Sequence, residues 1–246
     1  NILDPIDLID GIDLNSLIKK RTEGLMQPQQ APFITEDTKK EFPSGIPEFG
    51  TDALRFTFAS LATTGRDVRF DLKRIEGYRN FCNKLWNAAR FIIMNTEGVK
   101  LPAKKPNPAN MSLADIWIQG KLHSVIKSVE KNITNYRIDL IANSLYDFVW
   151  NDYCNWYLEL SKSILKDDDQ ANLEQKHATQ LNLLYTLDAT LKCLHPIIPF
   201  ITEELWQTIN TGQKKSSIMV ENYPNSKDFI VDKPVLDQMD WLIAFV

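Results

Sequence analysis

The chain has 246 residues, 43% of them hydrophobic and 10% aromatic, which is enough for a sizeable core and argues against disorder throughout. Its formal net charge of -4 argues against a protein that is basic over its whole surface, although it leaves room for a local basic patch. The three cysteines form no C-x-x-C pair and no apolar run approaches the ~18 residues of a membrane helix, so we expect a reduced protein without disulfides, structural zinc or a membrane span.

The opening part of the chain predicts short, separated elements. Residues 1–11 read as a loop with a proline turn, and Asp13 can cap a short helix over residues 14–21. A linker rich in Gln and Pro follows, and a second short helix begins at Thr35.

A stronger helix begins after Gly50, with Thr51 or Asp52 as its cap. The next segment alternates apolar with charged residues, which predicts an extended stretch. Read on its own, its cluster of cations is best explained as a solvated face; these cations are Arg66, Arg69, Lys73 and Arg74.

Residues 75–95 predict a long helix with one apolar stripe and one polar face. The polar face carries Asn80, Asn83, Asn87 and Arg90. Asparagine is a mediocre helix former because its amide competes for backbone hydrogen bonds. An amide presents a donor beside an acceptor, which suits the edge of a nucleobase, but it can equally brace a neighbouring helix. Spacing alone leaves both interpretations open.

Three further helices are predicted to pack together. Ser112 caps the first, with Asp115 completing the capping motif, and this helix runs to about residue 132. The second, residues 136–165, carries a heavy load of Trp and Tyr that is typical of a core. The third covers residues 172–193.

The stretch LHPIIPFITEELW, residues 194–206, predicts a sharp corner between two helices. Pro196 and Pro199 suit the turn and the first turn of a new helix, respectively. We interpret His195 as a buried corner residue rather than a catalyst. Residues 217–223 read as a short strand, and a final helix begins near Asp232.

The sequence carries no phosphate-binding glycine loop and no nucleophile elbow. We therefore predict no catalytic residue and no metal ligand in this chain, which favours a binding or scaffolding role. Because it starts without Met and ends in the apolar run WLIAFV, we also expect a piece of a longer protein.

Several motifs, taken in their order, resemble the valyl-tRNA synthetases, a class I aminoacyl-tRNA synthetase family. The resemblance spans essentially the whole chain, and its opening residues resemble the sequence that follows the family's KMSKS loop. The motifs are GTDALRF (50–56), TGRDVRFD (64–71), RNFCNKLWNAARF (79–91), WNDYCNWYLEL (150–160) and LHPIIPFITEELW (194–206).

The resemblance implies a mainly α fold, namely a helical-bundle anticodon-binding domain that follows a small mixed α/β stem-contact region. The implied regions are residues 1–74, 75–212 and 213–246, the last being an extended segment and the start of a helix. The implied partners are valine tRNA and the family's catalytic and coiled-coil domains, in a monomeric, cytoplasmic enzyme. No cofactor is expected in this chain, whereas the full enzyme uses ATP and Mg.

The resemblance also changes the interpretation of individual residues. It implies that the polar face of helix 75–95 reads the anticodon, with Phe81 and Phe148 as stacking surfaces for bases. It reverses the plain interpretation of the cation cluster, which becomes a set of contacts to phosphates of the tRNA stem. The implied anticodon contacts are Arg79, Phe81, Asn83, Lys84, Asn87, Arg90 and Phe148; the implied stem contacts are Arg66, Arg69, Lys73 and Arg74.

Two alternatives remain at this point. The corner motif alone would also fit the isoleucyl and leucyl members of the wider subclass. A helical protein–protein interaction module would explain the same polar face without RNA.

Overall fold

The computed structural model describes residues 3–63, 71–166, 169–211 and 216–245. Helices dominate this part of the chain, which confirms the predicted mainly α fold class. The α-helices are α1 (Pro5–Asp10), α2 (Leu14–Thr22), α3 (Ala31–Glu41), α4 (Thr51–Leu61), α5 (Leu72–Asn95), α6 (Leu113–Thr134), α7 (Ile138–Asp147), α8 (Leu158–Lys166), α9 (Leu173–Leu194), α10 (Pro199–Ile209) and α11 (Lys233–Phe245). Between them lie the 3-10 turns η1 (Pro28–Gln30), η2 (Pro108–Asn110), η4 (Gln170–Asn172), η5 (Ile218–Val220) and η6 (Ser226–Asp228), and the π-helix η3 (Phe148–Tyr157).

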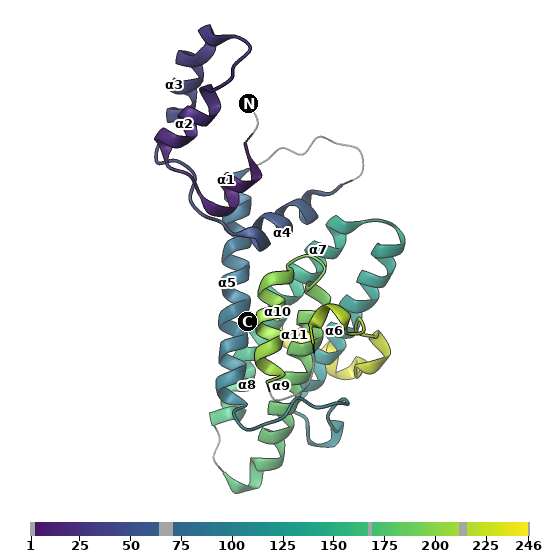
Figure 1. Cartoon of the computed structure of the whole chain (residues 1–246). Helices are drawn as coiled ribbons and strands as arrows, with labels where there is room; N and C mark the ends of the chain where they lie inside the picture. Colours follow the sequence, from purple (N-terminus) through teal and green to yellow (C-terminus); the bar gives the residue numbers. More distant parts are fainter. Residues whose placement is uncertain (1–2, 64–70, 167–168, 212–215, 246) are drawn as a thin grey trace.

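Helix α5 runs along one side of a bundle that contains α6 to α10 (Figure 1). At one end of the molecule, α2 and α3 form a hairpin that projects away from the bundle. Helices α1 and α4 lie between this hairpin and the bundle, while α11 packs on α6. The molecule is therefore elongated along α5.

Two hydrophobic cores lie along that axis. The larger core fills the bundle and fully buries big side chains such as Trp117 and Trp206. The smaller core joins α1, α2 and the start of α5. Helix α4 serves both cores, because Leu54 belongs to the smaller one and Phe56 to the larger one. The domain boundaries expected at residues 74 and 212 stay predictions, and α4 joins the regions on either side of the first.

Two predicted caps are present. The Asp13 carboxylate accepts hydrogen bonds from the backbone N–H groups of Asn15 and Ser16 at 2.9 and 3.1 Å, and α2 begins directly after it. Ser112 and Asp115 form the full capping box at the start of α6. Each such cap satisfies donors that the first turn of a helix leaves free.

The prediction of a loop over residues 1–11 is wrong. Asp4 accepts a hydrogen bond from the Ile6 N–H at 2.9 Å, and Pro5 occupies the first turn, so α1 forms here. The helix that was expected to begin at Thr35 begins four residues earlier, at Ala31.

The expected strand content is reduced to isolated bridges and a helical turn among the described residues. Within residues 3–63, the expected mixed α/β region contains isolated bridges in place of strands, with Ile12 and Ile46 exchanging two 2.8 Å hydrogen bonds. Residues 217–223 contain the 3-10 turn η5, since the Ser217 hydroxyl accepts from the Met219 N–H and caps it. The segment 64–70 lies outside the described residues.

The long helix predicted over residues 136–165 is continuous from α7 to α8, but its middle is the π-helix η3. The wider turn carries Tyr153 and Tyr157 into the core, where both are fully buried. The Tyr157 hydroxyl donates to the buried Asp115 carboxylate at 2.7 Å and accepts from the Asn182 amide at 2.8 Å. This network ties the π-helix to α6 and α9.

The corner between α9 and α10 forms as predicted, and α4 holds it. Asp52 accepts from the backbone N–H of Ile201 at 2.7 Å, at the first turn of α10. Arg55 donates to the carbonyl oxygens of Pro196 and Ile197 at 3.1 and 2.8 Å. The expectation that Thr51 or Asp52 caps α4 itself is wrong, because Gly50 occupies that position and Asp52 caps a different helix.

Candidate functional site

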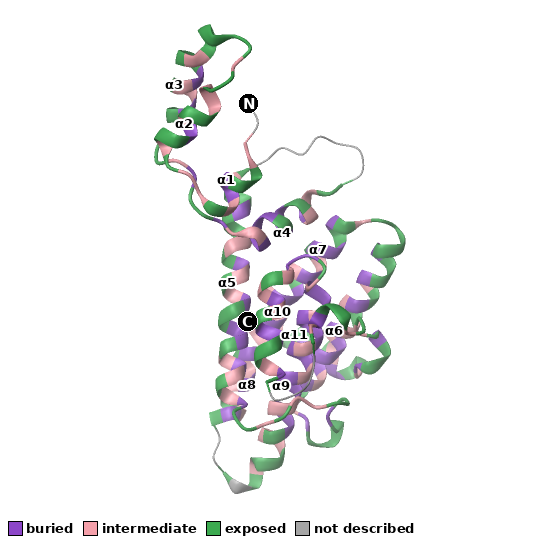
Figure 2. Ribbon diagram, in the orientation of Figure 1, coloured by how far each residue is buried: buried purple, intermediate pink, exposed green. Residues whose placement is uncertain are grey.

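The strongest candidate site is the outward side of α5. Asn80, Asn83, Asn87 and Arg90 are all exposed there, in successive turns of one helix face. Figure 2 shows the exposed and half-buried residues along this helix. We call these four residues the α5 polar face. Its amides and guanidinium offer hydrogen-bond donors and acceptors to solvent, which confirms the expected orientation.

A shallow hollow adjoins this face where α4, α5 and α10 meet. It has a volume of about 270 Å³ and is lined in part by Thr51, Arg79, Asn83 and Phe200. The Phe200 ring is 64% exposed although it is a large hydrophobic side chain. An exposed ring beside an amide and a guanidinium is the combination that unstacked nucleobases bind.

Two further aromatic side chains flank the α5 polar face. Trp86 is 43% exposed and follows Asn83 by three residues, so it lies about one turn further along. Phe91 follows Asn87 by four residues and is half-buried, with the Lys162 ammonium 5.8 Å from its ring centroid. Aromatic surface is therefore accessible on both flanks of the face.

Phe81 and Phe148, which the sequence analysis expected to stack on bases, are both buried. Phe81 is 0% exposed and Phe148 1% exposed, and both belong to the main core. The Phe81 ring packs 5.0 Å from the rings of both Phe56 and Tyr146. Neither ring can reach a base in this conformation, because the bundle covers both faces.

Arg79 and Lys84, expected to contact the anticodon, instead make contacts that fix α5. Arg79 donates to the Glu48 carbonyl oxygen at 3.0 Å, which ties α5 to the loop ahead of α4. Lys84 donates to the Asn155 side-chain oxygen at 2.6 Å, and its ammonium lies 3.9 Å from the centroid of the Trp150 ring. These contacts hold α5 near its start and its middle, and RNA contact by either side chain stays a prediction.

The structure describes two of the four residues of the predicted cation cluster. Lys73 and Arg74 are exposed in the first turn of α5, which Asp71 caps through the Lys73 N–H. Arg66 and Arg69 lie outside the described residues. The two exposed cations stand on the same helix as the α5 polar face, several turns before Arg90.

Burial shifts the pKa values of two titratable side chains near the site. Burial raises the pKa of Cys82, behind the α5 polar face, to about 12, so its thiol stays protonated at neutral pH. Burial lowers the pKa of His195, whose Nδ1 lies 2.8 Å from Thr202 Oγ1 inside the corner. Within the described ranges, no three His, Cys, Asp or Glu side chains gather as a metal ion would require. None of the described helices combines the length and hydropathy needed to cross a bilayer.

The profile of a family described as the anticodon-binding domain of tRNA ligase matches residues 115–246. The chain belongs to this family. The profile begins at Asp115, so α5 lies ahead of the matched part of this anticodon-binding domain.

Relatives of the anticodon-binding domain cover α5 as well. A valine–tRNA ligase of Legionella pneumophila (strain Paris) is 51% identical over 244 residues, which is 98% of this chain and 26% of the relative. Valine–tRNA ligases of Coxiella burnetii (strain RSA 493 / Nine Mile phase I) and Dechloromonas aromatica (strain RCB) are 50% and 52% identical over 244 residues, 98% and 94% of this chain and 26% of each relative. The chain thus spans about a quarter of the length of these relatives.

A solved structure shares the fold of the anticodon-binding domain. It is that of the ternary LeuRS–tRNA–LeuAMS complex of Agrobacterium radiobacter K84, with a TM-score of 0.53 and 15% identity. The similarity covers 76% of this chain and 20% of the other one. At this identity it supports the helical fold alone.

The sequence analysis did not predict a binding role for Phe200, Trp86 or Phe91 in this domain. The available signal was that Phe200 does not share the stripe of Ile201 and Leu205 on α10, and Trp86 stands apart from the buried Leu85 and Ala89. A large aromatic residue off an apolar stripe is expected to face solvent.

Proposed function

We propose that this chain is the anticodon-binding region of a valine–tRNA ligase and that the α5 polar face binds the anticodon loop of valine tRNA. One observation carries the proposal: the asparagines and Arg90 face solvent together, with exposed aromatic rings beside them. Support for valine comes from the relatives at about 50% identity, which are valine–tRNA ligases.

The α5 polar face supplies the base-reading groups in this proposal. Asn83 and Asn87 each present an amide donor and acceptor, and Arg90 adds a forked donor. A protein reads RNA sequence mostly in single-stranded loops, whose bases are free to turn outward. We assign the discrimination between anticodons to these three side chains.

Base stacking in the proposal belongs to the accessible rings. Phe200 takes the role first given to Phe81, because its ring is 64% exposed at the rim of the hollow. Trp86 and Phe91 are the remaining rings beside the face. Each stacked base contributes about 1–3 kcal/mol, which corresponds to a roughly 5- to 150-fold change in affinity.

Phosphate contacts complete the proposed interface. Lys73 and Arg74 are exposed, and neither forms an ion pair among the described residues, so we assign them to phosphates of the adjoining stem. Arg79 and Lys84 serve chiefly as braces that keep α5 in place, since both already have partners. Affinity that depends on phosphate contacts falls with added salt.

The longer protein, by the same proposal, joins valine to its tRNA through an adenylate made from ATP. We place the ATP and Mg chemistry in the part of the relatives that lies outside this chain, since the chain matches only 26% of their length. We further propose a cytoplasmic, monomeric enzyme, in which this region positions the tRNA and does not catalyse.

The test compares binding of valine tRNA with binding of the same transcript carrying a replaced anticodon. We expect the wild-type chain to prefer the native anticodon, and Asn87→Ala to reduce that preference by about 5- to 100-fold, as the loss of one good base contact would. Asn143→Ala, at an exposed asparagine on α7, is the matched control and should leave the preference unchanged. Equal affinity of the wild-type chain for both transcripts would refute anticodon reading and favour the protein-interaction alternative.

The stacking role is tested separately with Phe200→Ala and Phe200→Tyr. The tyrosine variant keeps an aromatic face and should bind like the wild type, whereas the alanine variant should bind at least fivefold more weakly. Phe245→Ala removes another exposed ring, from α11, and serves as the control. If the alanine variants at 200 and 245 bind alike, Phe200 does not stack on RNA.

A further inference from the structure

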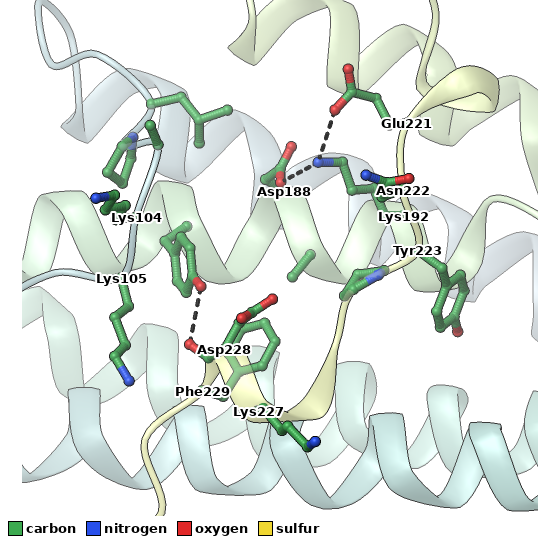
Figure 3. A pocket seen from close by; sticks show the side chains of 16 residues that line it. Lys104, Lys105, Asp188, Lys192, Glu221, Asn222, Tyr223, Lys227, Asp228 and Phe229 are labelled. Atoms are coloured by element: carbon green, nitrogen blue, oxygen red, sulfur yellow. Dashed lines mark hydrogen bonds and ion pairs between the residues drawn. The ribbon is translucent and has the colours of Figure 1, made fainter.

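A second concave surface lies between α9, the linker that follows α5, and the segment around η6 (Figure 3), and shares no lining residue with the hollow beside the α5 polar face. It has a volume of about 670 Å³ and is open to solvent along one side. Tyr185 and Ala189 of α9 contribute to its floor, and Phe229 packs there with its ring 5.4 Å from that of Tyr185. Lys104, Lys105 and Lys227 stand around it. We call this surface the lysine trough.

Two acidic residues of the trough, Asp188 and Glu221, share one lysine, Lys192. Lys192 Nζ lies 2.9 Å from an Asp188 carboxylate oxygen and 3.4 Å from a Glu221 carboxylate oxygen (Figure 3). The other Asp188 oxygen accepts from the Trp206 indole N–H at 2.8 Å. These contacts fix the side chains and offset one of the two negative charges.

The remaining charge of the lysine trough is mainly positive. Lys104, Lys105 and Lys227 are exposed, and none of them forms an ion pair among the described residues. Asp228 is the opposing acid at the rim, and its backbone carbonyl accepts from the Tyr185 hydroxyl at 3.1 Å. Four lysines against three carboxylates give the whole lining a net charge of +1, in a chain of net charge -4. The three lysines without an ion pair are free to bind an anion.

We propose that the lysine trough is a second RNA contact, which holds backbone phosphates of a single-stranded stretch without reading its bases. The ligand class rests on the proposed function, because tRNA supplies the polyanion. Lysine is a flexible point charge that neutralises phosphates without selecting a base. The trough's volume of about 670 Å³ leaves room for a short length of a single strand.

The test measures the affinity of this 246-residue chain for tRNA over a range of salt concentrations. Lys104→Gln, Lys105→Gln and Lys227→Gln are combined in one variant. Each single-strand phosphate contact contributes about 0.7 to the slope of log affinity against log salt, so losing three lowers the slope by about 2. Between 50 and 200 mM salt, this corresponds to a loss of affinity that is smaller by a factor of roughly 16.

A matched variant removes the same charge elsewhere. Lys127→Gln, Lys131→Gln and Lys233→Gln change three lysines of α6 and α11 outside the lysine trough. We expect this control to keep a slope close to that of the wild type. Equal slopes for the two triple variants would overturn the proposal, because net charge alone would then explain the effect.

Two further readouts separate this proposal from anticodon reading. The trough variant should weaken binding equally for transcripts with native and replaced anticodons, whereas Asn87→Ala should change their ratio. In one outcome the trough variant keeps the wild-type salt slope while Asn87→Ala still changes the ratio of affinities for the two transcripts. That result would refute the proposed role of the lysine trough and leave anticodon reading by α5 intact. Titration with ATP is the third arm: if the triple variant lost ATP binding but kept tRNA binding, the trough would be a nucleotide site and the RNA assignment would be wrong.

Discussion

The Asp52 cap gives the sharpest test of how α4 supports the corner beside the α5 polar face. Asp52 is 9% exposed, and its carboxylate accepts from the Ile201 N–H at 2.7 Å and, more weakly, from the Phe200 N–H at 3.4 Å. Replacing it with alanine leaves the first turn of α10 without these acceptors. The variant also removes a negative charge from the positive end of that helix.

The magnitude follows from these two losses. A lost helix cap costs about 1 kcal/mol, and the charge at the helix end contributes about 0.3–1 kcal/mol. We therefore expect Asp52→Ala to lower the free energy of unfolding by about 2 kcal/mol, which lowers Tm by about 4–8 °C in a chain of this size. Thermal unfolding followed by circular dichroism at 222 nm measures this shift.

Asp52→Asn separates the hydrogen bonds from the charge. Burial raises the pKa of Asp52, so its charged form carries a desolvation cost that the amide does not. The asparagine variant keeps an acceptor for the Ile201 N–H and should lose less than about 1 kcal/mol. Asp237→Ala, at an exposed carboxylate on α11, is the control. A Tm for Asp52→Ala that equals the control would refute the role of Asp52 in capping α10.

Three other predictions concern stability. Burial raises the pKa of Asp152 to about 6, against an opposing contribution from Lys121. The folded state therefore binds more protons than the unfolded state between pH 4 and 6. The contribution of Asp152 to stability falls as the pH rises through that window. As the pH rises from 5 to 7.5, the free energy of unfolding of Asp152→Asn, measured in urea, should increase by about 1 kcal/mol relative to that of the wild type. A difference between the two proteins that does not change with pH would contradict the raised pKa of Asp152. Phe81→Ala should cost about 3–5 kcal/mol in the same assay, whereas a cost below about 1 kcal/mol would mean that the ring is not in the core. Asp115→Ala should cost about 3 kcal/mol or more, because it strands several buried donors, and an unchanged urea midpoint would contradict this account of the network.

Periodicity and caps predicted several helices from local rules, although α1 and η5 were missed despite the local caps Asp4 and Ser217. The capping pair Ser112 and Asp115 placed the start of α6, and the prolines after Leu194 placed the corner. The face of α5 followed from the 3.6-residue period, so the orientation of its asparagines could be predicted without a structure. These features depend on residues within a few positions of each other.

Long-range contacts explain what the sequence could not predict. Asp52 could cap either its own helix or a distant one, and only the fold brings α10, nearly 150 residues later, within its reach. Phe81 sits at the border between the two faces of α5, and the packing of Phe56 and Tyr146 decides that it is buried. Phe200 becomes part of the site because α4, α5 and α10 converge there.

The most direct test of anticodon reading is photo-crosslinking from a 4-thiouridine placed in the anticodon loop of valine tRNA, with the cross-linked peptides identified by mass spectrometry. The account predicts adducts within residues 80–91 of α5 and at Phe200, and their loss when unlabelled tRNA with the native anticodon competes. Adducts confined to the α2–α3 hairpin or to α11, with none on α5, would contradict it.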